Sequence, residues 1–403
     1  MLDVAKQMLD YLSQYFLNWS HGTDWQSRLS FLRLFHYITV RSAGAAITSL
    51  LLCWWLGPKV IAWLKELKFG QEYVDLAGQA GLADLRGQKK GTPTMGGILI
   101  VVALVVSTMF WAQWNAQVEL TLLSVLVLSG LGFYDDYAKI LKQSGGGTPP
   151  RVKLVTQCAL ATFVGFYLWN LPAKSELILP KSKTAFDIYH SNLVSTLMLP
   201  FYKYPLDVGV MVGVIVVVLA IVGSSNAVNL TDGLDGLAIG CTLIVGFVFL
   251  VFTYLAGNIK AATYLQIPYV PGAGELTVFC SALLGAGLGF LWFNCHPAQV
   301  FMGDTGSLAL GGAFGLVAVL IHQPFVLVIA GGVFVAEAVS VILQKGWFKF
   351  TRLRTGTGQR IFLMAPLHHH FEKKGWHESQ VVMRFFILCV LCAVVALATL
   401  KLR

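Results

Sequence analysis

Long apolar stretches recur along the whole chain. Ten of them are apolar enough to form membrane-spanning helices, at residues 36–56, 96–114, 119–134, 154–171, 207–222, 237–256, 275–294, 307–322, 324–343 and 381–400. A helix that rises 1.5 Å per residue needs about 20 apolar residues to cross a hydrocarbon layer roughly 30 Å thick. The pattern therefore predicts an all-α, polytopic integral membrane protein with about ten transmembrane helices. Pro58 is expected to kink or end the first helix, because proline cannot donate a helical hydrogen bond.

The composition of the chain agrees with this pattern. Of the 403 residues, 56% are apolar and only 12% are charged, whereas about a quarter of the residues in a soluble domain are charged. A soluble globule and a disordered chain are therefore excluded. The cysteines are odd in number, and the one pair with CxxC spacing, Cys389 and Cys392, lies inside an apolar stretch. This indicates small buried side chains and leaves the redox compartment open.

Lys and Arg are divided unevenly between the predicted loops. The loops that follow odd-numbered helices contain 17 of them, and the loops that follow even-numbered helices contain 5. Because cytoplasmic loops retain Lys and Arg, both termini are predicted to be periplasmic. The basic face suits a phosphorylated substrate and membrane lipid headgroups. It is interrupted by membrane spans, which argues against nucleic acid as a partner.

The chain divides into two parts. Residues 1–35 form an amphipathic N-terminal segment in which no removable signal is evident. Residues 36–403 form a single ten-helix membrane domain whose cytoplasmic loops are expected to carry an active site, at 58–95, 135–153, 223–236, 295–306 and 344–380. No internal repeat is evident, which weakens the case for a transporter built from inverted halves. Faces of small residues permit a homodimer.

Five aspartates lie near the predicted cytoplasmic ends of the helices. Asp135 and Asp136 end the third span, Asp232 and Asp235 lie between the fifth and sixth, and Asp304 precedes the eighth. An aspartate at the bilayer centre costs about 2.5–3.5 kcal/mol on insertion scales, so these side chains should face a wet cleft or lie beyond the hydrocarbon. Capping of the next helix is a competing interpretation for Asp235 and Asp304.

The residues around these aspartates suit a phosphate group. Glycine lets the backbone approach a phosphate closely, and the N-terminus of a helix favours an anion. Carboxylates from several loops suit Mg²⁺, which stays partly hydrated and shares substrate phosphates. Neither a Walker motif nor a Rossmann motif occurs. The sequence therefore predicts a phosphate and magnesium site at the cytoplasmic membrane surface.

Three consecutive histidines, His368, His369 and His370, lie in the ninth loop. On a helix their side chains would point in different directions, which disfavours a shared metal ion. Hydrogen bonding or proton transfer around a diphosphate is favoured, because histidine titrates near neutral pH. Solvated loop histidines and a zinc site are the alternatives.

Other polar and small residues have ordinary explanations. Glu337 and Gln344 lie seven residues apart on one helix face, which favours a buried polar pair over a proton relay. The spacing of Gly311 and Gly315 indicates close helix packing. The isolated histidines are expected to be structural: His36, His190 and His322.

Five motifs closely resemble those of the bacterial phospho-N-acetylmuramoyl-pentapeptide transferases, the MraY family. They are KKGTPTMGG at 89–97, FYDD at 133–136, NAVNLTDGLDG at 226–236, FMGDTGS at 301–307 and PLHHHFE at 366–372. The resemblance runs from about residue 36 to the C-terminus. It implies transfer of phospho-MurNAc-pentapeptide from UDP-MurNAc-pentapeptide to undecaprenyl phosphate, which gives lipid I and UMP. It also implies Mg²⁺ as cofactor and a cytoplasmic active site in the bacterial inner membrane.

The resemblance implies roles for individual residues. Asp304 resembles the magnesium ligand, and Phe301 resembles the residue that stacks on uracil. The catalytic positions that it implies are Asp135, Asp136, Asp304, His368, His369 and His370. The substrate-binding positions are Lys89, Lys90, Thr94, Lys139, Lys153, Asn229, Asp232, Gly233, Leu234, Asp235, Asn294 and Phe301. The segment before residue 36 and the segment at 172–205 are longer than the corresponding segments usually are in this family.

Two other functions stay open at this point. A transferase of GlcNAc-1-phosphate from UDP-GlcNAc to the same polyprenyl phosphate would share the aspartates, although PLHHHFE favours the muramoyl enzyme. A membrane transporter or flippase would use Glu337 and would need acidic sites near the middle of the bilayer. Within the transferase reaction, direct attack by the lipid phosphate is favoured over an aspartyl-phosphate intermediate, because a phosphate dianion is already a competent nucleophile.

Overall fold

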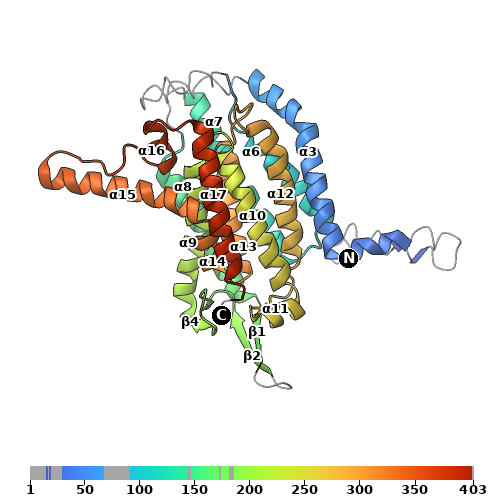
Figure 1. The fold of residues 1–403 in the computed structure, drawn as a ribbon. Coiled ribbons are helices and arrows are strands. Elements are labelled where there is room, and N and C mark those ends of the chain that lie inside the picture. The colour runs from blue at the N-terminus through green and yellow to red at the C-terminus, as the bar shows by residue number, and fades with distance from the viewer. Residues whose placement is uncertain are drawn as a thin grey trace.

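The computed structural model describes residues 15–16, 18–19, 30–67, 91–142, 147–171, 174–180 and 186–401. Within these residues the chain forms a helical bundle with two small β-sheets at one end (Figure 1). The elements are η1 (Ser30–His36), α3 (Ile38–Glu66), α6 (Gly97–Trp111), α7 (Ala116–Lys142), α8 (Pro150–Asn170), β1 (Lys174–Pro180), β2 (Phe186–Asn192), β3 (Thr196–Leu197), β4 (Leu206–Asp207), α9 (Gly209–Thr231), α10 (Leu237–Ala256), α11 (Ile259–Leu265), α12 (Glu275–Asn294), α13 (Gly303–Leu320), α14 (Pro324–Ala330), α15 (Gly332–Thr355), α16 (Leu367–Lys373) and α17 (Glu378–Ala398).

Each predicted span corresponds to a helix or, in one case, to a pair of helices. Eight helices among the described residues are long and apolar enough to cross a membrane. The ninth predicted span is the pair α14 and α15, which is bent by 84°, and the second is α6, a shorter apolar helix of 15 residues. These elements confirm the prediction of an all-α polytopic membrane protein.

The first span differs from its prediction. Helix α3 continues through Pro58 to Glu66, so the proline does not end it, and a kink at this position stays a prediction. Neighbouring helices commonly compensate for a proline inside a membrane span. Here α3 packs along α12, and a side chain at Gly57 would collide with the ring of Phe293. Close packing against α12 is therefore compatible with an α3 that stays helical on both sides of Pro58.

Helix α13 lies in the centre of the bundle, against α9 and α7. A side chain at Gly311 would collide with the backbone of Ser224, and one at Gly315 would approach the backbone of Ala220. The Ser224 hydroxyl donates a hydrogen bond to the Gly311 carbonyl at 2.7 Å. Small residues thus let two backbones approach closely, which confirms the packing role predicted for this pair of glycines.

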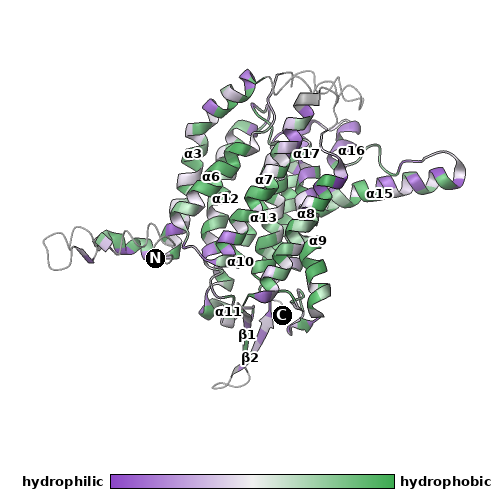
Figure 2. Cartoon of the chain, turned by 180° about the vertical axis from the view of Figure 1, so that it is seen from behind, coloured by the Kyte–Doolittle hydropathy of each residue, from purple (hydrophilic) through white to green (hydrophobic). Residues whose placement is uncertain are grey.

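The two ends of the bundle differ. One end carries α16, the last turns of α7 and the first turn of α13, and the other carries the β1–β2 hairpin (Figure 1). The first turn of α3 and the last turn of α17 also lie at the hairpin end. Apolar residues cover the bundle helices between the two ends, whereas α15 mixes apolar and hydrophilic residues (Figure 2).

Two of the isolated histidines lie at the hairpin. His322 is buried, with Nδ1 2.8 Å from the Ser175 hydroxyl and Nε2 2.7 Å from the Thr196 carbonyl oxygen. Strands β1 and β2 are antiparallel, and His190 lies opposite Glu176, with Nδ1 3.6 Å from its carboxylate. The contacts of His322 confirm its predicted structural role, whereas His190 is exposed and makes only a surface contact across the strands. The same role for His36, which is exposed at the end of η1, stays a prediction.

Candidate active site

Two helix ends bring three of the predicted carboxylates together. Helix α7 runs past residue 134 to Lys142, so Asp135 and Asp136 lie within the helix and not beyond its end. Helix α13 begins at Gly303, before the predicted start at 307, so Asp304 lies in its first turn. A side chain at Gly132 would collide with the backbone of Asp304. The absence of a side chain there lets the first turn of α13 rest directly on α7.

Asp135, Asp136 and Asp304 form what we call the acidic cluster. One carboxylate oxygen of each lies within 4.8 Å of the others. Asp135 and Asp136 are buried and Asp304 is half-buried. Oδ1 of Asp304 accepts a hydrogen bond from the side-chain amide of Asn229 at 2.8 Å. Converging carboxylate oxygens are ligands that Mg²⁺ and Ca²⁺ prefer, so the acidic cluster fits a divalent cation.

Two lysines neutralise part of this negative charge. Lys153, from α8, has its Nζ atom 2.6 Å from Oδ2 of Asp135 and 2.6 Å from Oδ2 of Asp304. Lys139, one turn after Asp135, lies 2.7 Å from Oδ2 of Asp135 and 3.3 Å from Oδ1 of Asp136. Three carboxylates beside two ammonium groups leave an excess of negative charge, and the ammonium groups are placed to contact a phosphate that enters the site.

Backbone and hydroxyl donors orient the two aspartates of α7. Oδ1 of Asp135 accepts a hydrogen bond from the backbone N–H of Thr148 at 2.7 Å. Oδ2 of Asp136 accepts from the backbone N–H of Thr305 at 3.1 Å and from its hydroxyl at 3.0 Å. Asp136 is therefore anchored to the first turn of α13, whereas Oδ2 of Asp135 faces the two lysines.

Asp232 is the C-cap residue of α9 and joins the same end of the bundle. Its carboxylate accepts a hydrogen bond from the backbone N–H of Gly303. Burial raises the pKa of Asp232 to about 8, and the negative charges of Asp304 and Asp136 act in the same direction. A divalent cation near these carboxylates would favour their ionised forms.

The capping interpretation of Asp235 and Asp304 is wrong. Helix α10 begins after Gly236, and helix α13 begins after Met302, and neither has a side-chain cap. Asp304 lies one position inside α13, where its carboxylate contacts Lys153 and Asn229.

Asp235 belongs to a separate group of polar side chains. Its Oδ2 accepts from the backbone N–H of Ala298 at 3.1 Å and lies 3.2 Å from Nδ1 of His296. Glu378 lies 3.7 Å from the same ring nitrogen and accepts from the backbone N–H of Asp235 at 2.9 Å. These contacts join the 232–236 loop to the start of α17. Sequence reasoning missed His296 and Glu378, which lie outside the quoted motifs.

The segments before α6 and α13 run side by side. The backbone N–H of Phe301 donates to the Pro93 carbonyl, and the Gly96 N–H donates to the Phe301 carbonyl, both at 2.8 Å. The Thr94 hydroxyl faces Gly303, at the start of α13. The first motif therefore contacts the motif that carries Asp304. Lys89 and Lys90 lie outside the described residues.

Asn294 supports this arrangement through its amide. The amide nitrogen donates to the Val300 carbonyl at 2.8 Å, and the amide oxygen accepts from the Gly236 N–H at 3.1 Å. Since Asn294 is buried and both ends of its side chain bind backbone, it fixes the position of two loops. Leu234 is also buried within the second of these loops.

The three consecutive histidines lie on α16 and turn to different partners. Nδ1 of His369 lies 2.6 Å from the Glu372 carboxylate, and Nδ1 of His370 accepts from the backbone N–H of Leu363 at 3.1 Å. Burial lowers the pKa of His370, and the positive charge of Lys374 lowers it further. The prediction that the side chains diverge therefore holds for their hydrogen-bond partners only, because the rings of His368 and His369 are in contact, with centroids 4.1 Å apart.

His368 is buried and held by Glu337 from α15. Oε1 of Glu337 lies 3.1 Å from Nδ1 of His368, and the same carboxylate accepts from the backbone N–H groups of His368 at 3.2 Å and Leu367 at 2.6 Å. An ionised carboxylate only accepts, so Nδ1 carries the proton and Nε2 is an acceptor. Nε2 is buried without a hydrogen-bond partner among the described residues, and it faces Gly233.

The predicted pairing of Glu337 with Gln344 is wrong. The Gln344 amide oxygen accepts from the backbone N–H groups of Ile361 and Phe362, each at 3.0 Å, and its nitrogen donates to the Phe362 carbonyl. Glu337 is indeed buried in the bundle interior, but its partner is the N-terminus of α16. The return of the chain after α15 brings α16 to Glu337, and spacing along one helix does not reveal such a contact.

Known proteins match nearly the whole chain. A family model described as Glycosyl transferase family 4 matches residues 118–322, and a phospho-N-acetylmuramoyl-pentapeptide-transferase signature matches residues 89–101. A phospho-N-acetylmuramoyl-pentapeptide-transferase of Methylacidiphilum infernorum is 49% identical over 378 residues, which cover 93% of this chain and 97% of the relative. The chain belongs to the phospho-N-acetylmuramoyl-pentapeptide transferase family.

Other members of the family are similarly close. The relative from Opitutus terrae is 48% identical over 389 residues, 95% of this chain and all of its own length, and that from Syntrophus aciditrophicus is 47% identical over 378 residues. Family membership confirms the resemblance drawn from the motifs and makes the chain a transferase. The family model covers α7 to α13 and therefore includes all three carboxylates of the acidic cluster.

Proposed function

We propose that this chain transfers phospho-MurNAc-pentapeptide from UDP-MurNAc-pentapeptide to undecaprenyl phosphate, which yields lipid I and UMP. The observation that carries this proposal is the acidic cluster with Lys139 and Lys153 at one end of a membrane bundle. Such a site can bind phosphate groups at a position that both a lipid phosphate and a water-soluble nucleotide can reach. The names of the relatives support the same substrates.

The proposed location is the cytoplasmic face of the bacterial inner membrane. The support is the excess of Lys and Arg in the odd-numbered loops, 17 against 5, because cytoplasmic loops retain these residues. With the acidic cluster on that face, the β1–β2 hairpin and both termini are proposed to be periplasmic.

Mg²⁺ is the proposed cofactor, and Asp304 of the acidic cluster is its proposed ligand. The all-oxygen donor set and the excess negative charge support this choice. When bound, the ion would supply positive charge that stabilises the diphosphate and the leaving UMP.

The side chains of the site are proposed to act on charge and position. The reaction exchanges one phosphoanhydride for another, so the main barrier is the repulsion between an anionic lipid phosphate and an anionic diphosphate. Lys139 and Lys153 are placed to reduce this repulsion by binding phosphate oxygens. Their contacts with Asp135 and Asp304 hold both ammonium groups at the site before substrate arrives.

We favour direct attack by the lipid phosphate. Both oxygens of Asp135 are already engaged, one with the Thr148 N–H and the other with two lysines, and Asp136 is held by Thr305. A carboxylate that is paired in this way is a weak nucleophile. These contacts support a positioning role for both aspartates over a covalent aspartyl phosphate.

The uridine group is proposed to bind between the 232–235 loop and Phe301. Phe301 is half-buried, and its backbone contacts fix it beside the start of α13. Nε2 of His368 faces Gly233 from the other side and could accept a hydrogen bond from the donor substrate.

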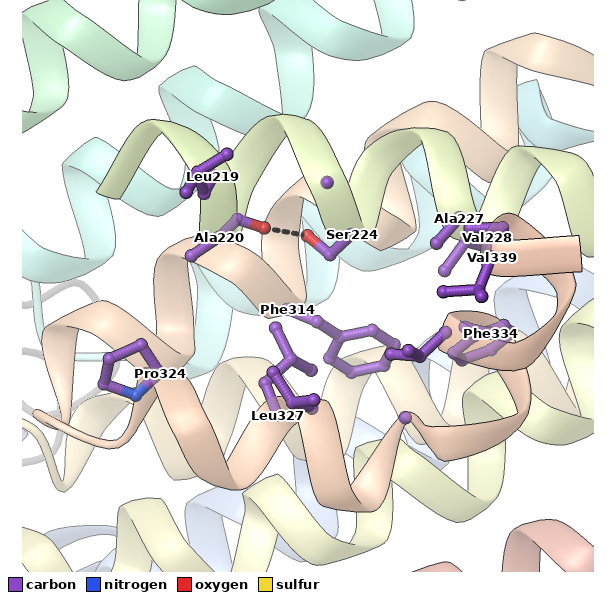
Figure 3. A pocket seen from close by; sticks show the side chains of 15 residues that line it. Leu219, Ala220, Ser224, Ala227, Val228, Phe314, Pro324, Leu327, Phe334 and Val339 are labelled. Carbon is purple, nitrogen blue, oxygen red and sulfur yellow. Dashed lines mark hydrogen bonds between the residues drawn. The ribbon is translucent and has the colours of Figure 1, made fainter. Parts of the chain in front are cut away.

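An apolar cavity is the proposed site for part of the isoprenoid chain, the part next to the phosphate. It lies between α9, α13, α14 and α15 and has a volume of about 250 Å³ (Figure 3). The rings of Phe314 and Phe334 and the side chain of Leu327 line it. Val228 also lines the cavity, and the next residue, Asn229, donates to Asp304. A lipid chain in this cavity would therefore lie close to the acidic cluster.

The test is a reaction with purified full-length protein, undecaprenyl phosphate and Mg²⁺. With UDP-MurNAc-pentapeptide we expect UMP and a lipid-linked muramoyl product, and with UDP-GlcNAc we expect neither. Product from UDP-GlcNAc alone would support the GlcNAc-1-phosphate transferase. Movement of lipid across vesicles without release of UMP would support a flippase.

A further inference from the structure

We propose that a basic hollow beside α15 binds the phosphate group of an anionic membrane phospholipid. The hollow has a volume of about 500 Å³ and lies between α15, the segment 360–365 and α16. Three cationic side chains line it, together with apolar ones: Lys345, Arg360 and Lys373, with Val341, Phe348 and Met364. This lining combines positive charge with apolar surface, as the boundary between a headgroup and its acyl chains requires.

The cations of the hollow are not neutralised by the protein. The residues that line it include no Asp or Glu. Among the described residues, neither Lys345, Arg360 nor Lys373 forms an ion pair with a carboxylate, whereas Lys139 and Lys153 at the acidic cluster each contact at least two. An anionic group that enters the hollow therefore meets uncompensated positive charge.

The side chains along α15 are those expected of a helix at a membrane surface. Val341, Gln344, Lys345 and Phe348 follow each other at intervals of three, one and three residues, so they share the helix face that lines the hollow. The opposite face exposes apolar side chains at Val339, Ile342, Phe350 and Leu353. An exposed apolar face opposite a basic one is typical of a helix that lies in the membrane interface. Figures 1 and 2 show α15 projecting sideways from the bundle, with both kinds of residue along it.

Hydrogen bonds hold the wall of the hollow in place. Gln344 binds the backbone of Ile361 and Phe362 through three hydrogen bonds at 3.0 Å, so the chain that returns from α15 stays against the helix. This contact brings Arg360, which lies beyond the end of α15, to the same hollow as Lys345. The cations are therefore gathered by the fold and do not merely follow one another in sequence.

The hollow is separate from the proposed reaction site. It shares no lining residue with the apolar cavity of Figure 3 or with the acidic cluster. The inference does not rest on the proposed reaction, since lipid binding can be measured without substrate.

The test is competition between two phospholipids for the full-length protein in detergent. Phosphatidylglycerol and phosphatidylcholine are added in equal amounts, and bound lipid is counted by native mass spectrometry. Removing two cations with Lys345→Gln and Arg360→Gln should lower the retention of phosphatidylglycerol about tenfold and leave phosphatidylcholine unchanged. The matched control, Lys349→Gln with Arg354→Gln, removes two positive charges from α15 at positions that do not line the hollow, and it should bind as the wild type does.

Three outcomes would overturn the proposal. Equal loss in both double variants would show only a general effect of charge. Displacement of phosphatidylglycerol by inorganic phosphate would show an anion site that does not recognise lipid. Displacement by one equivalent of undecaprenyl phosphate would assign the hollow to the carrier substrate. If the first double variant does not fold, Lys373→Gln alone, on the α16 side of the hollow, is subject to the same measurement and the same outcomes.

Discussion

The acidic cluster and the histidine helix α16 lie at the same end of the bundle, but they are built differently. The acidic cluster joins the ends of α7, α8 and α13 through ion pairs that water and substrate can reach, because Asp304, Lys139 and Lys153 are only partly buried. His368 is instead fixed by Glu337, and both side chains are almost fully buried. The comparison indicates that the acidic cluster and its lysines act on the substrate through charge, whereas His368 presents a hydrogen-bond acceptor in a fixed position.

The largest effect is expected for Asp304, which contacts both lysines and is the proposed magnesium ligand. Asp304→Asn removes one negative charge from the acidic cluster, and kcat should fall at least about 10³-fold. Release of UMP, measured across a range of Mg²⁺ concentrations, checks this. The matched control is Asp207→Asn, at an exposed position in β4 at the opposite end of the bundle. Wild-type turnover and unchanged metal dependence in Asp304→Asn would remove Asp304 from the proposed site.

The next effect concerns Lys153, whose Nζ atom bridges Asp135 and Asp304. Lys153→Gln should lower kcat about 10²-fold, because the transition state loses one positive charge. Lys153→Arg should recover part of the rate, since it restores the charge with a different geometry. The control is Arg151→Gln, an exposed cation two residues earlier on α8. A loss of the same size in both variants would mean that the general charge of α8 matters and the bridge does not.

A smaller effect, about tenfold in kcat, is expected for the positioning residue Glu337. In Glu337→Gln the amide oxygen should keep the shortest of the three hydrogen bonds, that from the Leu367 N–H. The amide nitrogen then takes the place of Oε1, where it faces Nδ1 of His368 and loses the bond from the His368 N–H. The ring must then carry its proton on Nε2, so it can no longer accept a hydrogen bond there. Nitrogen NMR of labelled histidine, assigned with His368→Gln, reports this change of tautomer.

The control for Glu337 lies on α16 itself. Glu372→Gln changes the partner of His369 and should leave the tautomer of His368 as it is. If Glu337→Gln lowers the rate while the ring keeps its proton on Nδ1, the loss has another structural cause. That result would contradict the view that His368, unlike the acidic cluster, acts as a fixed hydrogen-bond acceptor.

The same contrast explains what the sequence predicted and what it did not. All three members of the acidic cluster lie in long motifs, and the apolar pattern placed every span, so both were predictable. The span ends were not, because α7 and α13 continue into the site, where ion pairs and hydrogen bonds replace contact with lipid. Glu337 was assigned the wrong partner because its contact with His368 depends on the 84° bend between α14 and α15 and on the return of the chain.

The last effect concerns stability and not turnover, and it involves Asp232, whose pKa burial raises from the usual 3.8 to about 8. Between these values the folded protein keeps a proton that the unfolded chain has lost. In the absence of metal, stability should therefore fall as the pH rises from about 4 to about 8, by at most about 1.4 kcal/mol per pH unit. The melting temperature in detergent should fall over this range, and less so with Mg²⁺ present, because a nearby cation favours the ionised carboxylate.

Asp232→Asn should flatten this dependence, because an amide has no proton to lose. The exposed Asp207→Asn should keep the wild-type slope. A slope that survives in Asp232→Asn would assign the proton to another group. A slope that Mg²⁺ leaves unchanged would separate Asp232 electrostatically from the acidic cluster, although its carboxylate binds the backbone next to Asp304. The sensitivity of the slope to Mg²⁺ therefore measures how far the charge of the acidic cluster reaches into the loop on which His368 packs.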